Sequence, residues 1–215
     1  MNEQNSSKVN PERVNPEGIV EMSENHRYIR FQEVIRITFN GLLTSYKAFD
    51  TTDGVEIAWH KISIPEINEE EKLRFDQFMS HLNNFPNHKD YFVENLSYWF
   101  SVESPNEQHY LNIITTNYET IREFIGKVKT LRWKIVKKWC RQLLQALACL
   151  QQHEPPIIHR YLSCSHIYID SGLGTITVGD IWLSFQSNAF NLANSVNDTT
   201  RPNFDDPQVM NFELL

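Results

Sequence analysis

The strongest constraint on the fold is one long amphipathic segment in the second half of the chain. Its apolar side chains recur every three or four residues, at Leu131, Ile135, Trp139, Leu143, Leu147 and Leu150. This spacing places them on one face of an α-helix. Two consecutive prolines, at 155 and 156, stop such a helix. The pattern therefore predicts a helix over 131–150 with one buried face.

The first half of the chain has the pattern of β-strands instead. Apolar and β-branched residues form short runs, bounded by turn-forming residues. The runs predict strands over 28–38, 43–49, 55–59, 91–102 and 109–116. Asn68, followed by Glu71, predicts the start of a helix inserted after the third strand. The apolar face of this helix comprises Phe75, Phe78, Met79 and Leu82.

Two short strands, over 167–169 and 175–178, are predicted after the long helix. The chain therefore reads as five strands with one inserted helix, then the long helix and a small hairpin. A β-rich half followed by a helical half predicts an α+β fold. Residues 1–25 are polar and carry a repeated Val-Asn-Pro-Glu, which is typical of a disordered leader.

Charge and composition exclude several classes of protein. The 20 basic and 27 acidic residues give a net charge of −7, which argues against nucleic acid as the main partner. No run of about 18 apolar residues predicts a transmembrane helix, and residues 1–25 lack the apolar core of a secretion signal. The cysteines, Cys140, Cys149 and Cys164, fit reduced thiols. We expect a cytoplasmic protein, with the nucleus or endomembranes as alternative compartments.

Two runs of residues resemble a known family. Trp-Cys-Arg-Gln-Leu-Leu at 139–144 and Pro-Pro-Ile-Ile-His-Arg at 155–160 resemble a protein kinase domain. They look most like the with-no-lysine (WNK) kinases and the related nuclear-receptor-binding-protein pseudokinases. The resemblance implies a C-terminally truncated protein kinase-like fold in four parts. These are a disordered leader over 1–27, an N-lobe over 28–116, the start of a C-lobe over 117–183, and an activation-segment-like loop and tail over 184–215.

A kinase holds the nucleotide phosphates under a glycine-rich loop, which the resemblance places near 37–45. Backbone amides approach phosphate closely only where side chains are absent. Thr38 and Asn40 stand where glycines are expected, and only the adjacent Gly41 remains. Glycine is scarce throughout, at 7 of 215 residues, about 3% against a typical ~7%. We therefore expect no standard phosphate-binding loop.

The phosphate-binding lysine of a kinase is also replaced. The resemblance places it after Ala58 and Trp59, where His60 stands. The with-no-lysine kinases carry this lysine on the second strand, at the position of Leu43 here. The helix glutamate that pairs with the lysine corresponds to Phe78. The lysine and the glutamate are expected to be lost together, because a buried carboxylate without its partner is costly.

The catalytic loop carries further replacements. The catalytic His-Arg-Asp corresponds to His159, Arg160 and Tyr161, and a phenol is a poor substitute for the catalytic carboxylate. Ser163 replaces the lysine of this loop. His166 replaces the second metal ligand, and imidazole is a poor ligand for Mg²⁺.

The metal-binding Asp-Phe-Gly motif is only partly retained. Asp180 keeps the metal-binding carboxylate, but Trp182 stands in place of the glycine. A side chain of this size is expected to obstruct the hinge and fill the nucleotide pocket. Pro207 marks what remains of the Ala-Pro-Glu signal at the end of the segment.

Together these replacements imply a pseudokinase, which would act as a signalling or trafficking scaffold by binding other proteins. No cofactor is expected. The alternative is a divergent serine/threonine kinase or an ATP-binding domain of weak activity, with Ala58 at the nucleotide, Asp180 on Mg²⁺ and an unaligned lysine such as Lys47. A dimer or another partner would cover the truncated C-lobe. A third interpretation is a diverged product with no independent role.

Other residues have a plain structural interpretation. His159 is expected to pack and hydrogen-bond within the fold, and Trp59 and Trp139 to lie in the core. A zinc site made of His159, Cys164 and His166 would match no standard ligand spacing.

Positive charges outside the motifs need separate consideration. Lys61 alternates to the opposite face of its strand from His60. A basic stretch is expected to be a solvated helix face, with an acidic partner segment or anionic lipid as the alternative. It comprises Lys127, Lys129, Arg132, Lys134, Lys137, Lys138 and Arg141.

Overall fold

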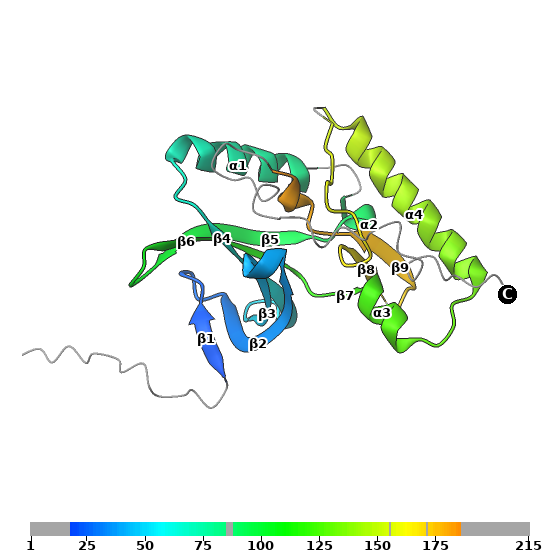
Figure 1. The fold of residues 1–215 in the computed structure, drawn as a ribbon, viewed down its shortest axis with the longest axis horizontal. Helices are drawn as coiled ribbons and strands as arrows, with labels where there is room; N and C mark the ends of the chain where they lie inside the picture. The colour runs from blue at the N-terminus through cyan, green and yellow to red at the C-terminus, as the bar shows by residue number, and fades with distance from the viewer. Residues whose placement is uncertain (1–17, 85–87, 155, 171, 186–215) are drawn as a thin grey trace, which may run out of the picture.

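The computed structural model describes residues 18–84, 88–154, 156–170 and 172–185. Within them, one antiparallel sheet has the strand order β1-β2-β3-β4-β6-β5 (Figure 1). Its strands are β1 (Ile19–Met22), β2 (Tyr28–Thr38), β3 (Leu43–Asp50), β4 (Val55–Ile64), β5 (Asn95–Glu103) and β6 (Gln108–Thr116). The five predicted strands of the first half are confirmed, although β4 runs five residues past its predicted end and β5 begins later than predicted.

The strand β1 corrects the expected extent of the leader. The sequence predicts disorder through residue 27, but β1 pairs with β2 in antiparallel register. Glu21 in β1 accepts hydrogen bonds from Arg30 Nε at 2.8 Å and from Lys61 Nζ at 3.0 Å. These partners lie in other strands, so the polar composition of the segment did not reveal them. Residues 1–17 of the expected leader lie outside the described residues.

The inserted helix α1 (Glu69–Asn83) begins at its predicted N-cap. The Asn68 side chain accepts a hydrogen bond from the backbone N–H of Glu71 at 2.9 Å, which satisfies one free donor of the first turn. Phe75, Met79 and Leu82 are buried. The helix therefore packs against the sheet through its predicted apolar face (Figure 1).

Two short helices, α2 (His88–Tyr91) and α3 (Ile121–Lys127), are not predicted by the sequence patterns. α3 begins with a capping box: Thr120 Oγ1 accepts from the Glu123 backbone, and Glu123 accepts from the Thr120 backbone. This Thr-x-x-Glu signal was present in the sequence. A seven-residue helix is too short for apolar periodicity to reveal it.

The long helix α4 (Trp133–Gln152) confirms the strongest prediction. It packs on a small sheet of β7 (Glu119–Thr120), β8 (Ile167–Asp170) and β9 (Thr175–Val178). Trp139 and Leu143 contact Ile169 and Ile176 in one apolar cluster. A 3₁₀ turn, η2 (Ile181–Ser184), follows β9, and another, η1 (Phe39–Gly41), links β2 to β3.

The core confirms the expected burial of the two tryptophans. Trp59 is 0% exposed on one side of the sheet, and Trp139 is 6% exposed on the buried face of α4. A larger apolar cluster joins the two halves of the chain, since it holds Leu43, Met79 and Trp182 together. In the described residues, no helix is long and apolar enough to cross a membrane.

Candidate functional site

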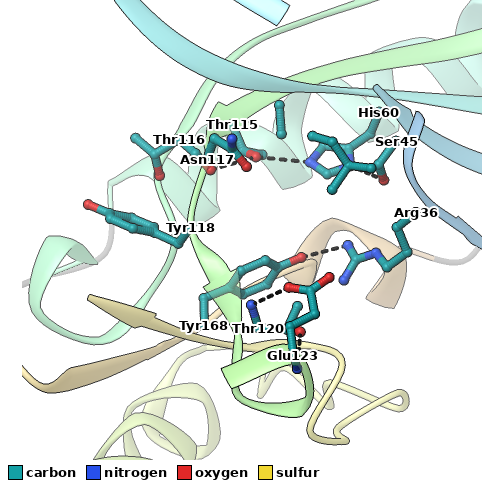
Figure 2. A pocket seen from close by; sticks show the side chains of 12 residues that line it. Arg36, Ser45, His60, Thr115, Thr116, Asn117, Tyr118, Thr120, Glu123 and Tyr168 are labelled. Atoms are coloured by element: carbon teal, nitrogen blue, oxygen red, sulfur yellow. Dashed lines mark hydrogen bonds between the residues drawn. The ribbon is translucent and has the colours of Figure 1, made fainter. Parts of the chain in front are cut away.

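A small polar hollow lies between the large sheet and the β7-β8-β9 sheet (Figure 2). It contains the positions at which the resemblance places a nucleotide, since Ala58 and His60 line it. Arg36 and Tyr168 point toward each other across it (Figure 2). Its free volume is about 20 Å³, which is room for roughly one water molecule. The side chains therefore fill most of this region.

His60 occupies one wall of the hollow, 3% exposed, between two hydroxyl groups. Its Nδ1 lies 2.8 Å from Ser45 Oγ, and its Nε2 lies 2.9 Å from Thr115 Oγ1. Thr115 donates its own proton to the carbonyl of Thr116 at 3.1 Å, so it accepts from Nε2–H of His60. Nδ1 then accepts from Ser45. Both ring nitrogens of a neutral imidazole are thereby satisfied.

Burial lowers the pKa of His60 to about 4, so the neutral form persists at physiological pH. Because the unfolded chain protonates this group near pH 6.5, acidification favours unfolding. We expect the contribution of neutral His60 to the free energy of unfolding to be fully present above pH 6.5. It should then fall toward pH 4 by up to about 1.4 kcal/mol per pH unit for this one group.

Urea denaturation at several pH values between 4 and 7, followed by tryptophan fluorescence, checks this expectation. His60→Gln keeps hydrogen-bonding groups but cannot titrate, so its stability should fall less steeply with acid. The pKa of His159 is also lowered by burial, so this histidine contributes to the slope that remains in the variant. Asp180, whose pKa is held low by Arg36 and His166, adds to this slope near pH 4. Identical pH dependence in wild type and His60→Gln would contradict the assignment.

Asp180 lies at the centre of a buried polar cluster and is 4% exposed. Three groups donate to its Oδ2: His166 Nδ1 at 2.7 Å, the Tyr168 hydroxyl at 2.9 Å and Arg36 Nη2 at 3.2 Å. Arg36 Nη2 also donates to the Tyr168 oxygen at 2.6 Å, and Nη1 donates to the Ser165 carbonyl. The guanidinium of Arg36, a residue of β2, thus connects the large sheet to the residues around Asp180.

The charges within this cluster stabilise each other. Burial by itself would raise the pKa of Asp180, but Arg36 and His166 outweigh burial and hold that pKa well below its usual range. Burial likewise opposes the charge on Arg36, yet Asp180 and Tyr168 raise the pKa of Arg36 above its ordinary value. The retained aspartate is therefore an anion whose countercharge is an arginine of the same chain.

The backbone at Gly179 and Asp180 allows this close packing. A Cβ at Gly179 would lie 2.3 Å from Cε2 of Tyr168, so only glycine lets the tyrosine ring reach the carboxylate. Asp180 itself has φ 57°, in the left-handed region. His159 stabilises the same segment, because its Nε2 lies 2.8 Å from the Gly179 carbonyl. His159 thus hydrogen-bonds within the fold, in a buried position.

Phe39 lies in η1, within the segment that would cover the phosphates in a kinase. It has φ 52° and is 8% exposed. Its ring meets that of Tyr161 edge-on, with centroids 5.1 Å apart, and stacks near His166 at 6.4 Å. An aromatic side chain thus occupies the space between this segment and the catalytic-loop positions.

Trp182 is completely buried and lies beside the hollow. Its ring centroid is 5.7 Å from that of His60, and it belongs to the largest apolar cluster. The large side chain therefore fills core space next to the hollow, rather than projecting into solvent.

The structure places other predicted site residues apart from this cluster. Leu43 is 0% exposed in the apolar core. Phe78 packs against the rings of Phe75 and Phe185. Ser163 is exposed, and its hydroxyl accepts from the backbone of Ser165 at 3.3 Å. Pro207 lies outside the described residues.

The lysines near the site are bound to carboxylates. Lys47 forms an exposed ion pair with Glu56 at 2.8 Å. Lys61 binds Glu21 and Glu103, on the face opposite His60 as the alternation predicts. Among the described residues, no three His, Cys, Asp or Glu side chains are grouped so that they could hold a metal ion.

Sequence reasoning missed three residues that define the cluster: Arg36, Phe39 and Tyr168. The signal for Phe39 was a bulky side chain in a segment expected to be glycine-rich. A charged residue within an apolar strand was the signal for Arg36. Nothing local pointed to Asp180 as the partner of Arg36, because 144 residues separate the two.

Comparison with known proteins places the chain among kinase-like sequences. It is 30% identical over 174 residues to the serine/threonine-protein kinase WNK of Caenorhabditis elegans, covering 79% of this chain and 9% of that protein. It is 31% identical over 194 residues to the probable serine/threonine-protein kinase WNK4 of Arabidopsis thaliana, covering 88% and 32%. Identity is 32% over 174 residues to the probable serine/threonine-protein kinase WNK6 of Oryza sativa subsp. japonica, covering 77% and 37%.

These alignments span 9–37% of the length of the relatives. No family model matches the chain.

Proposed function

Because the chain contains a protein kinase-like domain related to the WNK serine/threonine kinases, we propose that it is a pseudokinase that acts by binding other proteins. The ion pair between Arg36 and Asp180 carries this proposal. The carboxylate that would bind the catalytic metal is enclosed by Arg36, His166 and Tyr168. An internal cation thus neutralises the carboxylate that would hold the metal ion in phosphoryl transfer.

The residues present do not fit Mg²⁺ and ATP. A divalent cation on Asp180 would be next to the guanidinium that already binds this carboxylate, and like charges repel. The free volume of about 20 Å³ is far below the space that an adenine ring needs. Phe39 packs onto Tyr161, where the attacking hydroxyl would be oriented. Binding would require these groups to move away together.

One observation favours the alternative of a divergent kinase or weak ATP-binding protein. Asp180 is retained, remains ionised and lies beside a hollow with several hydroxyl groups. If Arg36 turned outward, this carboxylate would be free to bind a cation. Lys47 offers less support, because its ammonium group is paired with Glu56.

Nucleotide binding separates the two functions. A ligand present at a hundred times its Kd stabilises a protein by about 2.7 kcal/mol, which raises the Tm of a domain of this size by roughly 5–10 °C. We expect no such shift with millimolar ATP and Mg²⁺ or Mn²⁺. We also expect no transfer of labelled phosphate to generic substrates.

Asp180→Asn is the control for this experiment, since it removes the carboxylate with little change in shape. A thermal shift or phosphate transfer that disappears in Asp180→Asn would establish the divergent kinase and refute the pseudokinase. Each measurement needs a concurrent check by circular dichroism that the variant is folded.

The outer face of α4 supports a protein-binding role. Trp133 and Leu144 are each 66% exposed, and the helix carries no acidic residue. Its cations are Lys134, Lys137, Lys138 and Arg141. This combination suits an acidic partner segment with apolar anchors. Self-association through α4 is disfavoured, because two copies would bring equal positive charges together.

Light scattering across a range of protein concentrations tests self-association. We expect a monomer in wild type. A concentration-dependent dimer that dissociates in Leu144→Glu, but not in an exposed control such as Val102→Glu, would assign the α4 face to a second copy instead of an acidic partner.

A further inference from the structure

The outer face of α4 carries cations that lack carboxylate partners. α4 lies at the edge of the fold (Figure 1). Steps of four and three residues place Lys137, Arg141 and the exposed Leu144 on one side of the helix, away from the buried Trp139. Lys134 stands on the same outer side. Within the described part of the chain, none of Lys134, Lys137 and Arg141 forms an ion pair.

Other lysines of the described chain are neutralised. Each of the following forms an ion pair with a glutamate: Lys47, Lys61, Lys72, Lys89 and Lys127. Lys138 of α4 donates instead to the carbonyl of Gly174 at 2.9 Å. Cations one turn apart on a helix destabilise it by mutual repulsion. Carboxylates placed on the outer face of α4 would remove this repulsion.

Residues 203–215, which lie outside the described residues, carry the complementary chemistry. Their only charged side chains are the carboxylates of Asp205, Asp206 and Glu213. Two phenylalanines and two leucines accompany these carboxylates. The segment therefore combines negative charge with apolar anchors, which is the combination that suits the outer face of α4.

The chain between α4 and this segment is long enough for the two to meet. The last described residue, Phe185, belongs to the same apolar cluster as Ala146 and Leu150 of α4. Residues 186–202 follow it, and an extended chain of that length reaches up to roughly 55 Å. α4 has 20 residues and is therefore about 30 Å long. The segment can reach the whole outer face of α4 in its own chain.

We propose that residues 203–215 bind the outer face of α4 within the same chain. The carboxylates lie at the unpaired cations, and the apolar side chains pack against Leu144. A tethered segment has an effective concentration of up to about millimolar, so another protein must displace it to bind α4. The inference rests on the protein-binding role proposed for α4 and names the acidic segment that α4 binds.

Zero-length cross-linking of the full chain tests this contact. A carbodiimide activates a carboxylate, a nearby lysine amine attacks it, and an amide forms while the reagent leaves as a urea. We expect mass spectrometry to find amides that join residues 203–215 to Lys134 or Lys137. Their yield should fall at about 1 M salt, which screens exposed charges. Lys89 is the internal control, because its side chain is 78% exposed. Equal linkage to Lys89 would overturn the proposal.

A mixture of isotope-labelled and unlabelled chains shows whether each amide joins parts of one chain. We expect links within single chains only. Links between labelled and unlabelled chains would overturn the intrachain contact and assign the outer face of α4 to residues 203–215 of a second copy.

A combined variant measures how far the segment blocks α4. Asp205→Asn, Asp206→Asn and Glu213→Gln together remove its charge. The probe is a fluorescent peptide with the sequence of residues 203–215, followed by anisotropy. We expect the combined variant to bind this peptide at least about tenfold more tightly than wild type, because its own segment no longer competes. Asp198→Asn, outside the segment, is the matched control and should bind like wild type.

A second change places the peptide on α4. Lys134→Gln with Lys137→Gln, added to the combined variant, should weaken peptide binding about tenfold or more, and undiminished binding would overturn the proposal. Equal peptide affinity in wild type and the combined variant would overturn the intrachain contact but leave α4 as a surface for acidic partners. Peptide binding to neither would refute both roles of α4, whereas the pseudokinase assignment is decided separately by the nucleotide experiment.

Discussion

Asp180→Asn is expected to lower the free energy of unfolding by about 3–5 kcal/mol, because it leaves the buried charge of Arg36 without its counterion. The Arg36 side chain is only 13% exposed and that of Asp180 is 2% exposed, so water cannot replace the lost partner. Urea denaturation of wild type and variant measures the difference.

Two controls show whether the loss comes from the unpaired charge. In the double variant Arg36→Met with Asp180→Asn no charge is stranded, so it should be more stable than Asp180→Asn alone. Lys47→Met breaks an exposed ion pair with Glu56 and should change stability far less. If Asp180→Asn and Lys47→Met cost the same, the Arg36–Asp180 pair is not the central connection that we describe.

Trp182→Ala is expected to lower the free energy of unfolding by about 3–5 kcal/mol, because it removes a fully buried aromatic side chain and leaves a cavity. The indole Nε1 is buried without a hydrogen-bond partner within the described residues. Removing the indole also removes the free-energy penalty of this unsatisfied N–H. We therefore expect a loss of stability toward the lower end of the stated range. Urea denaturation again provides the measurement.

Trp133→Ala is the matched control for Trp182→Ala. It removes the same side chain from an exposed position of α4, where substitutions usually change stability by within about 0.5 kcal/mol. Similar losses in the two variants would mean that Trp182 does not anchor the core beside the hollow.

Much of the fold could be predicted from local sequence patterns. The periodicity of α4, the cap at Asn68 and the alternation of the large strands all concern neighbours in sequence, and the structure confirms them. β1 and the short helices α2 and α3 were missed. β1 depends on long-range pairing with Arg30 and Lys61, and the two helices are too short to show a period.

The candidate site was predictable position by position, but its arrangement was not. Aligning motifs identified His60, Tyr161, His166 and Asp180 as the positions to inspect. It could not show that His166 donates to Asp180, or that His60 is satisfied by hydroxyls from two neighbouring strands. Such contacts depend on side-chain directions across the packed sheets, which no local pattern contains.

The amino-acid sequence alone determined the order of the longer strands and of the two long helices, and the residue types at the kinase-like positions, because periodicity and motif spacing are local properties. Only the tertiary structure showed that Arg36 reaches Asp180 and that Phe39 turns inward onto Tyr161. The physical reason is that a buried ion pair is stable only where folding brings both charges together and removes them from water. That condition is met between residues 144 positions apart.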